Sequence, residues 1–295
     1  MQPLESVPNV SAGRDAAVVD AIGGAFSSSA RLLDVHSDVD HNRSVYTLVG
    51  SSGDDALVES LLVGIGKACE LIDLRRHEGV HPRVGVADVV PLVPLRPEDT
   101  ERASAAALRL GERVGGELGI PVFLYGEVGA GRRPAFFRRG GPEELQRRVE
   151  GGELAPDFGP VELDPACGAV LVGVRKPLVA FNVWLATGDV DVAHAVASVV
   201  RESGGGMPGV QALGFQLTSS GRVQVSVNVI DLDRASLHEV VERITAEAHA
   251  RGVDVDGCEL VGLLPARAVL EAAALPLGLR ELDESRVLEL RLIDL

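Results

Sequence analysis

A histidine and an arginine stand two positions apart in GVHPRVG, residues 79–85, a segment that suits neither a helix interior nor a strand interior. Imidazole has an unperturbed pKa of about 6.5, so His81 can take up and release protons near neutral pH. A guanidinium such as that of Arg83 can hold a carboxylate through two parallel hydrogen bonds. Pro82 stiffens the chain between them. The segment therefore favours a proton shuttle beside a carboxylate clamp, although a loop shaped only by glycine and proline is the simpler alternative.

A second polar cluster, DVHSDVDHNRS at residues 34–44, joins two strand-like runs. Composition alone favours a solvated acidic turn there. The functional alternative is a cluster that orients a small charged substrate, with Asp38 and Asp40 as candidate binding residues. Alternating His and Asp also suggests a metal site, but no second cluster has ligand spacing, so we predict no metal.

Composition excludes several classes of function. The chain has 295 residues and a net charge of −15, which opposes binding to nucleic-acid phosphates. The GIGKA run at 64–68 lacks the first glycine and the Ser/Thr of a phosphate loop, and its apolar spacing favours a helix. No nucleophile elbow, HExxH or dinucleotide-binding fingerprint is present.

The three cysteines, Cys69, Cys167 and Cys258, lie far apart without metal-ligand spacing. We therefore expect reduced thiols and a cytoplasmic protein. The N-terminus lacks the features of a signal peptide. The longest apolar stretch is interrupted by two basic residues and a proline at 175–177, so we expect no membrane span.

Apolar periodicity predicts the order β-α-β-β-α-β in the second half, which is typical of ferredoxin-like folds. The expected elements are a strand at 177–185, a helix at 189–202, a two-stranded hairpin around TSSG, a helix with a capping box at Ser236 and Glu239, and a strand at 258–265.

The first half repeats that order and adds a further helix and strand. Its expected elements are a strand at 4–10, a helix opening on Ser11, strands at 31–37 and 44–51, a helix at 54–76, a strand at 86–95, a helix at 98–118 and a strand at 121–127. VPNVSAG in the first half also corresponds to AFNVWLATG in the second. We therefore predict an α+β fold of two ferredoxin-like (βαββαβ) subdomains from an internal duplication, at 1–165 and 166–295, with the linker inside 129–168 and a ligand cleft between the subdomains.

These stretches resemble one family, the glutamate formimidoyltransferases (formiminotransferases). The resemblance covers roughly residues 4–275 in family order. The matching stretches are VPNVSAG, LLDVHSDVDHNRSVYTLVG, LIDLRRHEGVHPRVGVADVVPLVPL, PVFLYGE, APDFGP, VRKPLVAFNV, GVQALGFQL, VQVSVNVID and ELVGLLPARAVLEAA.

The resemblance implies transfer of a formimidoyl group from N-formimidoyl-L-glutamate to N5 of tetrahydrofolate, in histidine degradation, by a homodimer without a metal. His81 would be the catalytic acid/base, Arg83 would orient a substrate carboxylate, and Asp38 or Asp40 would hold the amidine or the imidazole. The folate segment would be 159–168, and the stretch VPNVSAG would add Asn9 to the substrate-binding residues. The segment positions that match the family pattern are Gly159, Pro160, Pro165 and Gly168.

The chain departs from the family pattern at several positions. Val80 stands where many relatives have Glu, His36 where some have a second Asp, and Cys167 where relatives can have an aromatic residue able to stack on a pterin. These departures leave two alternatives open: a related one-carbon transferase with another donor or acceptor, and a non-catalytic folate-binding module. The cyclodeaminase found in some relatives would be a separate enzyme.

Overall fold

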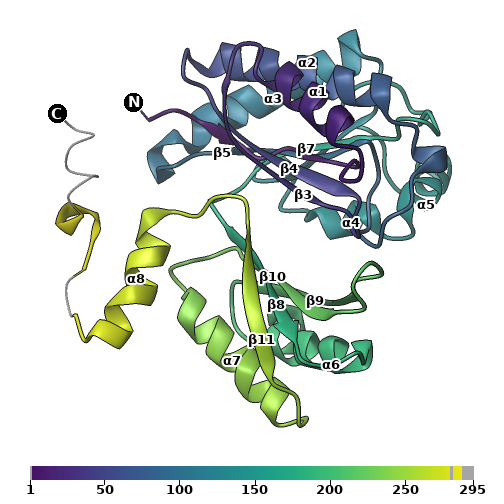
Figure 1. Cartoon of the computed structure of the whole chain (residues 1–295). Coiled ribbons are helices and arrows are strands. Elements are labelled where there is room, and N and C mark those ends of the chain that lie inside the picture. The colour runs from purple at the N-terminus through teal and green to yellow at the C-terminus, as the bar shows by residue number, and fades with distance from the viewer. Residues whose placement is uncertain (1, 280–281, 288–295) are drawn as a thin grey trace. The chain divides into compact units, whose positions relative to one another are not determined.

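The computed structural model describes residues 2–279 and 282–287 and is a mixed α+β protein. Its contacts divide the chain into two compact units, Met1–Lys176 and Pro177–Leu295. The sequence places the boundary earlier, between 165 and 166. The units divide after Lys176 because the strand Val170–Val174 is paired within the first sheet. Figure 1 traces both units from the N-terminus to the C-terminus.

The first unit contains a seven-stranded sheet. Across the sheet the strands run β3, β4, then β1 and β2, then β5, β7 and β6. Pairings from β3 to β5 are antiparallel, whereas β7 runs parallel to both β5 and β6. The strands are β1 (Glu5–Ser6), β2 (Asn9–Val10), β3 (Arg31–Asp38), β4 (Arg43–Val49), β5 (Ala87–Val93), β6 (Val122–Gly126) and β7 (Val170–Val174).

The strand expected at 4–10 is divided into β1 and β2 around Pro8. Proline has no N–H for the ladder, so the regular pairing stops there. The carbonyl of Pro8 still accepts a hydrogen bond from the N–H of Tyr46, which keeps the two pieces in one line.

Five α-helices belong to the first unit: α1 (Ala16–Phe26), α2 (Asp54–Leu71), α3 (Thr100–Glu117), α4 (Pro134–Arg138) and α5 (Gly141–Glu150). The expected helix start at Ser11 is wrong. Asp15 caps α1 through its side chain, whereas the hydroxyl of Ser11 donates to the carbonyl of Gly85. The helix expected at 54–76 ends at Leu71, and a separate 3-10 turn follows at Leu74–Arg76.

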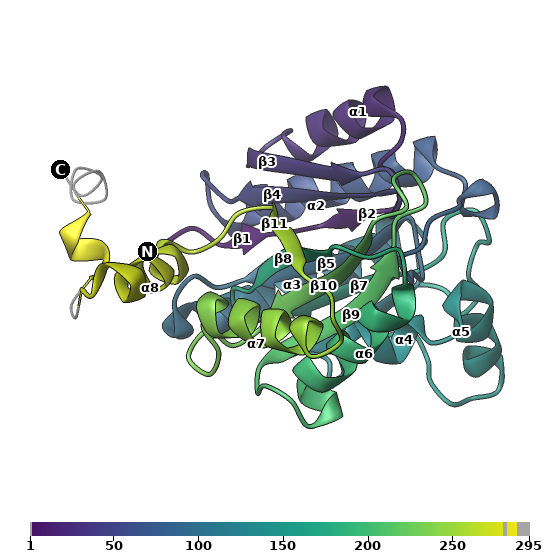
Figure 2. The same cartoon turned by 60° about the horizontal axis from the view of Figure 1, so that its bottom comes forward.

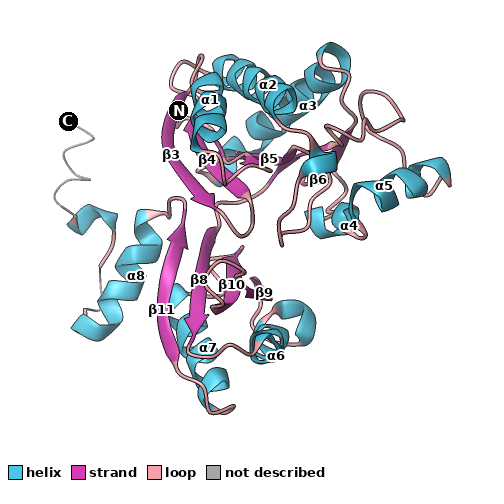
Figure 3. Ribbon diagram, turned by 45° about the vertical axis from the view of Figure 1, so that its right-hand side comes forward, coloured by secondary structure: helices cyan, strands magenta, loops and turns pink. Residues whose placement is uncertain are grey.

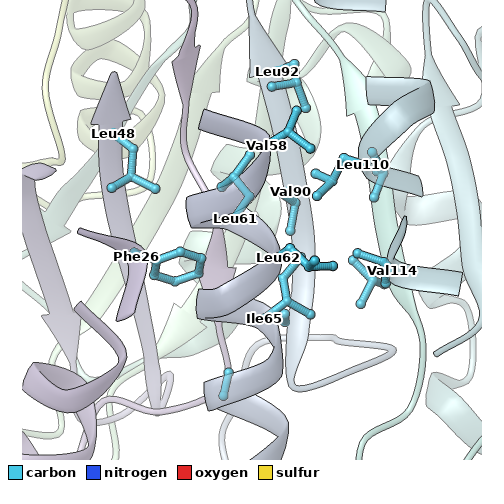
Figure 4. Packing of buried hydrophobic residues seen from close by; sticks show 14 of the residues in the cluster. Phe26, Leu48, Val58, Leu61, Leu62, Ile65, Val90, Leu92, Leu110 and Val114 are labelled. Carbon is cyan, nitrogen blue, oxygen red and sulfur yellow. The ribbon is translucent and has the colours of Figure 1, made fainter. Parts of the chain in front are cut away.

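Alternate residues of β5, β6 and β7 serve two hydrophobic clusters on opposite faces of the sheet. One cluster joins the sheet to α1, α2 and α3, with Val90, Leu92, Leu110 and Val114 among its residues (Figure 4). The other joins the opposite face to α4 and α5. Figure 3 shows the strands of this unit between the two groups of helices.

Residues 129–168, expected to contain a linker, are instead folded into the first unit. Phe137 and Leu145, from α4 and α5, are fully buried against Phe123 and Leu171 of the sheet. The expectation was wrong because the Gly, Pro and Arg content of the segment hid two short amphipathic helices.

Cys69 in α2 and Cys167 just before β7 form a disulfide, with Cα atoms 5.4 Å apart. The expectation of three reduced thiols is therefore wrong for this pair. The two residues are 98 positions apart, so their proximity arises only when α2 packs beside the start of β7. Cys258 is free and exposed.

The second unit is a four-stranded antiparallel sheet in the order β11, β8, β10, β9, with α6 and α7 against one face (Figure 2). The predicted βαββαβ order is confirmed here, and so is the capping box of Ser236 and Glu239. Its elements are β8 (Val179–Leu185), α6 (Val190–Val200), β9 (Val210–Gln216), β10 (Val223–Val229), α7 (Leu237–His249) and β11 (Val255–Val261), followed by α8 (Ala266–Leu277). None of the helices within the described ranges is long and apolar enough to cross a membrane.

Candidate active site

The structure brings the two polar loops of the first unit together. The N–H of Val80 donates to the carbonyl of Asp40, and the amide of Asn42 donates to the carbonyl of Glu78 at 2.9 Å. A side chain at Gly79 would collide with the backbone of His41, so only glycine allows the loops to meet this closely. The turn between β3 and β4 therefore supports the segment that contains His81.

Asp38 closes that turn. One of its carboxylate oxygens accepts the N–H groups of Asp40 and His41, and the other lies 3.0 Å from Nδ1 of His41. Burial would raise the pKa of Asp38, but the hydrogen bonds and the charge of His41 lower it. Asp38 is thus an ionised carboxylate that holds an imidazole.

A buried ionic network lies beneath these loops. Arg43 of β4 and Arg138 of α4 both donate to Oδ2 of Asp88, at 2.9 Å and 2.5 Å. Nε of Arg43 also donates to the side-chain oxygen of Asn9, one of the predicted substrate-binding residues. Asp88 is fully buried, so the two guanidinium groups supply the compensation that a buried charge requires.

A β-bulge sets the position of Asp88. Asn9 pairs with Val89 and Val10 pairs with Ala87, so Asp88 is the extra residue that the ladder skips. Its Oδ1 accepts the N–H of Val84 at 2.8 Å and thereby holds the end of the GVHPRVG segment. Burial would raise the pKa of Asp88, but the charges of Arg138 and Arg43 hold it far below its usual value.

His81 projects from this supported loop. Its Nδ1 lies 2.7 Å from the carbonyl oxygen of Pro82. Because a carbonyl can only accept, Nδ1 carries the hydrogen and Nε2 holds the free lone pair in the neutral ring. His81 is half-buried, and burial by the surrounding chain together with the charges of Arg43 and Arg138 holds the pKa of His81 well below 6.5. His81 is therefore a neutral base at pH 7.

Arg83 holds the loop from within. Its Nη1 donates to the carbonyls of Gly79 and His81, and its Nη2 donates to the carbonyl of His77. These three bonds fix the backbone on both sides of the catalytic candidate. Burial lowers the pKa of Arg83, although it remains a cation.

A cavity of about 750 Å³ opens beside the loop. His81, Arg83 and Pro165 all line it, and one helix wall comes from α5. This volume is suitable for a ligand of the size of a cofactor. The complete set of lining residues is Leu74, Arg75, Gly79–Arg83, Gly140–Glu143, Gln146, Arg147, Glu150 and Leu163–Pro165.

The other three positions that match the family pattern, Gly159, Pro160 and Gly168, lie outside the lining of this cavity. Gly168 packs against Val84 and Gly85 at the base of the loop, and its φ of +74° suits glycine. Gly159 contacts α3 and is absent from the lining of this cavity, as is Pro160. Cys167 belongs to the cluster on the α2 side of the sheet.

The sequence did not predict that Arg43, Arg138 and Asp88 form one buried network. The available signal was Asp88 itself, because a carboxylate inside an otherwise apolar strand needs a buried cationic partner. The partners come from β4 and from α4, and no sequence spacing identifies them. No group of three or more His, Cys, Asp or Glu that could hold a metal ion occurs in the part of the chain that the structure describes.

Comparison with known families gives two matches that together cover most of the chain. The formiminotransferase domain, N-terminal subdomain, matches residues 3–175, and the formiminotransferase domain matches residues 180–287.

Similar proteins carry the corresponding names. The glutamate formimidoyltransferase of Streptococcus pyogenes serotype M1 is 38% identical over 98% of both chains, and that of Thermoplasma acidophilum is 39% identical over 98% of this chain and 97% of its own. The formimidoyltransferase-cyclodeaminase of Sus scrofa is 42% identical over 92% of this chain, which spans 52% of that longer protein. The chain belongs to the formiminotransferase family.

Proposed function

We propose that this protein is a glutamate formimidoyltransferase, which transfers the formimidoyl group of N-formimidoyl-L-glutamate to N5 of tetrahydrofolate and releases L-glutamate. The observation that carries the proposal is the position of His81. It presents a neutral imidazole at the wall of a cavity large enough for a folate, in a chain of this family.

The reaction needs one group that moves a proton between two nitrogens. N5 attacks the formimidoyl carbon, and a tetrahedral intermediate forms. In the proposed mechanism Nε2 of His81 takes the proton from N5 and delivers it to the glutamate nitrogen as the carbon–nitrogen bond to glutamate breaks. A neutral imidazole can begin this cycle at pH 7, and such a group typically contributes about 10²–10⁴ in rate.

The surrounding polar residues would position the substrates. Arg83 donates three hydrogen bonds to backbone carbonyls. Its remaining N–H groups would bind a carboxylate of N-formimidoyl-L-glutamate. Asp38 or Asp40 would face the cationic amidine or the imidazole. Asn9 would act through Arg43, to which it is bonded.

Tetrahydrofolate is the co-substrate, and we assign its segment to 159–168. Pro165 lines the cavity and Gly168 shapes the backbone that leads out of it, which supports this assignment. Gly159 and Pro160 would contribute from the far end of the segment.

The finer description of the fold is also a proposal. The second sheet has the order β11, β8, β10, β9, and the first sheet repeats that order as β5, then β1 and β2, then β4 and β3. This supports two ferredoxin-like subdomains from an internal duplication. We further propose a cytoplasmic homodimer in histidine degradation, with another enzyme consuming the formimidoyl product.

The test is the release of glutamate from N-formimidoyl-L-glutamate in the presence of tetrahydrofolate. We expect His81→Ala to lower kcat by about 10²–10⁴. His194→Ala is the matched control, because His194 is an exposed histidine on α6 of the second unit and should leave the rate unchanged. Full activity of His81→Ala would contradict the mechanism. Transfer to another acceptor only would select the related one-carbon transferase, and folate binding without any transfer would select the binding module.

A further inference from the structure

The segment Leu163–Gly168 is a wall between two cavities of the first unit. On one side, Leu163, Asp164 and Pro165 line the large cavity that contains His81. On the other side, Asp164 and Ala166–Gly168 line a smaller cavity of about 220 Å³. Whatever fixes this wall also fixes one side of the candidate active site.

The Cys69–Cys167 disulfide fastens that wall to α2. Both cysteines line the small cavity, so this cavity gives a small molecule a route to the sulfur atoms. Cys167 is 8% exposed and Cys69 is half-buried, so the bond is partly shielded from solvent.

The backbone beside the disulfide is joined to the catalytic loop. The N–H of Val86 donates to the carbonyl of Cys167 at 2.9 Å, and the N–H of Ala169 donates to the carbonyl of Val84 at 3.0 Å. Val84 is the residue held by Asp88 at the end of the His81 segment. These hydrogen bonds therefore connect the backbone at Cys167 with the base of the loop.

We propose that the Cys69–Cys167 disulfide is a reversible thiol–disulfide site that controls how firmly the enzyme holds folate. The proposal rests on the proposed function, because it takes 159–168 as the folate segment. In the oxidised form the bond holds the wall against α2. In the reduced form the wall keeps its backbone hydrogen bonds but loses its covalent link, and folate binds more weakly.

The chemistry is exchange with low-molecular-weight thiols. A thiolate that enters the small cavity attacks one sulfur, forms a mixed disulfide with it and releases the other cysteine as a thiolate, which takes up a proton. A second thiolate attacks the mixed disulfide, and the remaining cysteine is released and protonated. In total two external thiols are oxidised to one disulfide, and one protein disulfide is reduced to two thiols.

A reversible role agrees with the proposed cellular location. In a reducing compartment disulfides are rare, and those that occur are usually transient, catalytic or redox-sensing. The cavity that reaches the sulfurs is the feature that a purely structural, enclosed disulfide would lack.

The experiment uses the full chain, prepared oxidised, reduced with dithiothreitol, and reoxidised. Alkylation and mass measurement count the free thiols, and calorimetry measures binding of 5-formyltetrahydrofolate, a folate that tolerates oxidation. We expect one free thiol when oxidised and three when reduced, with a Kd about threefold to tenfold higher in the reduced form and recovery on reoxidation.

Two variants separate the redox site from general damage. Cys69→Ser, on α2 and outside the folate segment, should bind like the reduced protein in either condition. Cys258→Ser removes the exposed thiol of the second unit and should keep the full redox response. Hydrogen exchange over 163–168 and 84–86 should rise on reduction in the wild type and should be insensitive to redox state in Cys69→Ser.

An equal Kd in both redox states, or three free thiols after oxidation, would overturn the proposal. The thiol count and hydrogen exchange need no substrate, so they test the redox site even if transfer fails. A protein that lacks transferase activity, but whose thiol count and hydrogen exchange still change with redox state, would contradict the proposed function and not the redox site.

Discussion

The two units share an order of strands but use their polar residues differently. Asn9 in the first unit and Asn182 in the second occupy corresponding positions in the sequence, within VPNVSAG and AFNVWLATG. Asn182 donates to the carboxylate of Glu259 on a neighbouring strand. Asn9 instead accepts from Arg43, which belongs to the buried network of Asp88.

The difference comes from elements of the first unit that have no counterpart in the described part of the second unit. Its sheet continues into β7 and β6, and α4 carries Arg138 onto Asp88. The same elements bring the wall at 163–168 to the cavity of His81. The shared strand order thus provides a scaffold, and the additional elements of the first unit provide the candidate chemistry.

The largest expected effect compares a buried carboxylate of the first unit with a half-buried carboxylate of the second. Asp88→Asn leaves Arg43 and Arg138 buried without their counter-charge, and we expect it to cost about 3–5 kcal/mol of unfolding free energy. Glu259→Gln affects a pair that is partly open to water and should cost less than about 1 kcal/mol. Urea unfolding measures both. Equal losses of unfolding free energy would show that the Asp88 network stabilises the protein no more than the Asn182–Glu259 pair does.

The pH dependence of activity tests how the buried charges of the first unit act on His81. His81 must be neutral to act as a base, so kcat/KM falls as pH drops through its pKa. Because burial and the charges of Arg43 and Arg138 lower that pKa, the acid limb should lie below pH 6.5.

Arg138→Met removes one of those positive charges and should move the acid limb to higher pH. Arg243→Met, on the exposed surface of α7 in the second unit, is the matched control and should leave the limb in place. If the acid limb of kcat/KM lies at the same pH in Arg138→Met as in the wild type, the buried network does not set the pKa of His81.

The smallest expected effect concerns the helix caps. Asp15→Ala removes the cap of α1 in the first unit, and Ser236→Ala removes half of the capping box of α7 in the second. Each should lower the unfolding free energy by about 1 kcal/mol, as measured by thermal or urea unfolding. A much larger loss in either variant would show that the helix depends on its cap more than on its packed face.

Local patterns in the sequence predicted most of the regular elements. Alternating and helical periodicities identified most strands and helices of both units but not β7, α4, α5 or α8, and the spacing of Ser236 and Glu239 identified a capping box. The start of α1 was missed because Ser11 and Asp15 are both good capping residues, and only the fold gives Ser11 another partner.

The candidate site was only partly predictable for a related reason. Loop chemistry predicted His81 and Arg83 as candidates, but the support beneath them depends on contacts between distant segments. Arg43, Asp88 and Arg138 come from three different elements, and the disulfide joins positions 98 residues apart. Such contacts depend on tertiary packing, which a single sequence does not encode in its local spacing.

The bulge at Asp88 leaves one residue of β5 without a partner across the ladder. A regular ladder has a period of two, so it would assign every side chain of the strand to a fixed side. Because Asp88 is the residue without a partner, its side chain is free of that alternation, while Val90 and Leu92 keep their places in the apolar cluster. Deleting Asp88 would leave Ala87 and Val89 as neighbours opposite Val10 and Asn9, so the ladder would become regular without a shift of the strand, and the change would remove the anion beneath the histidine alone.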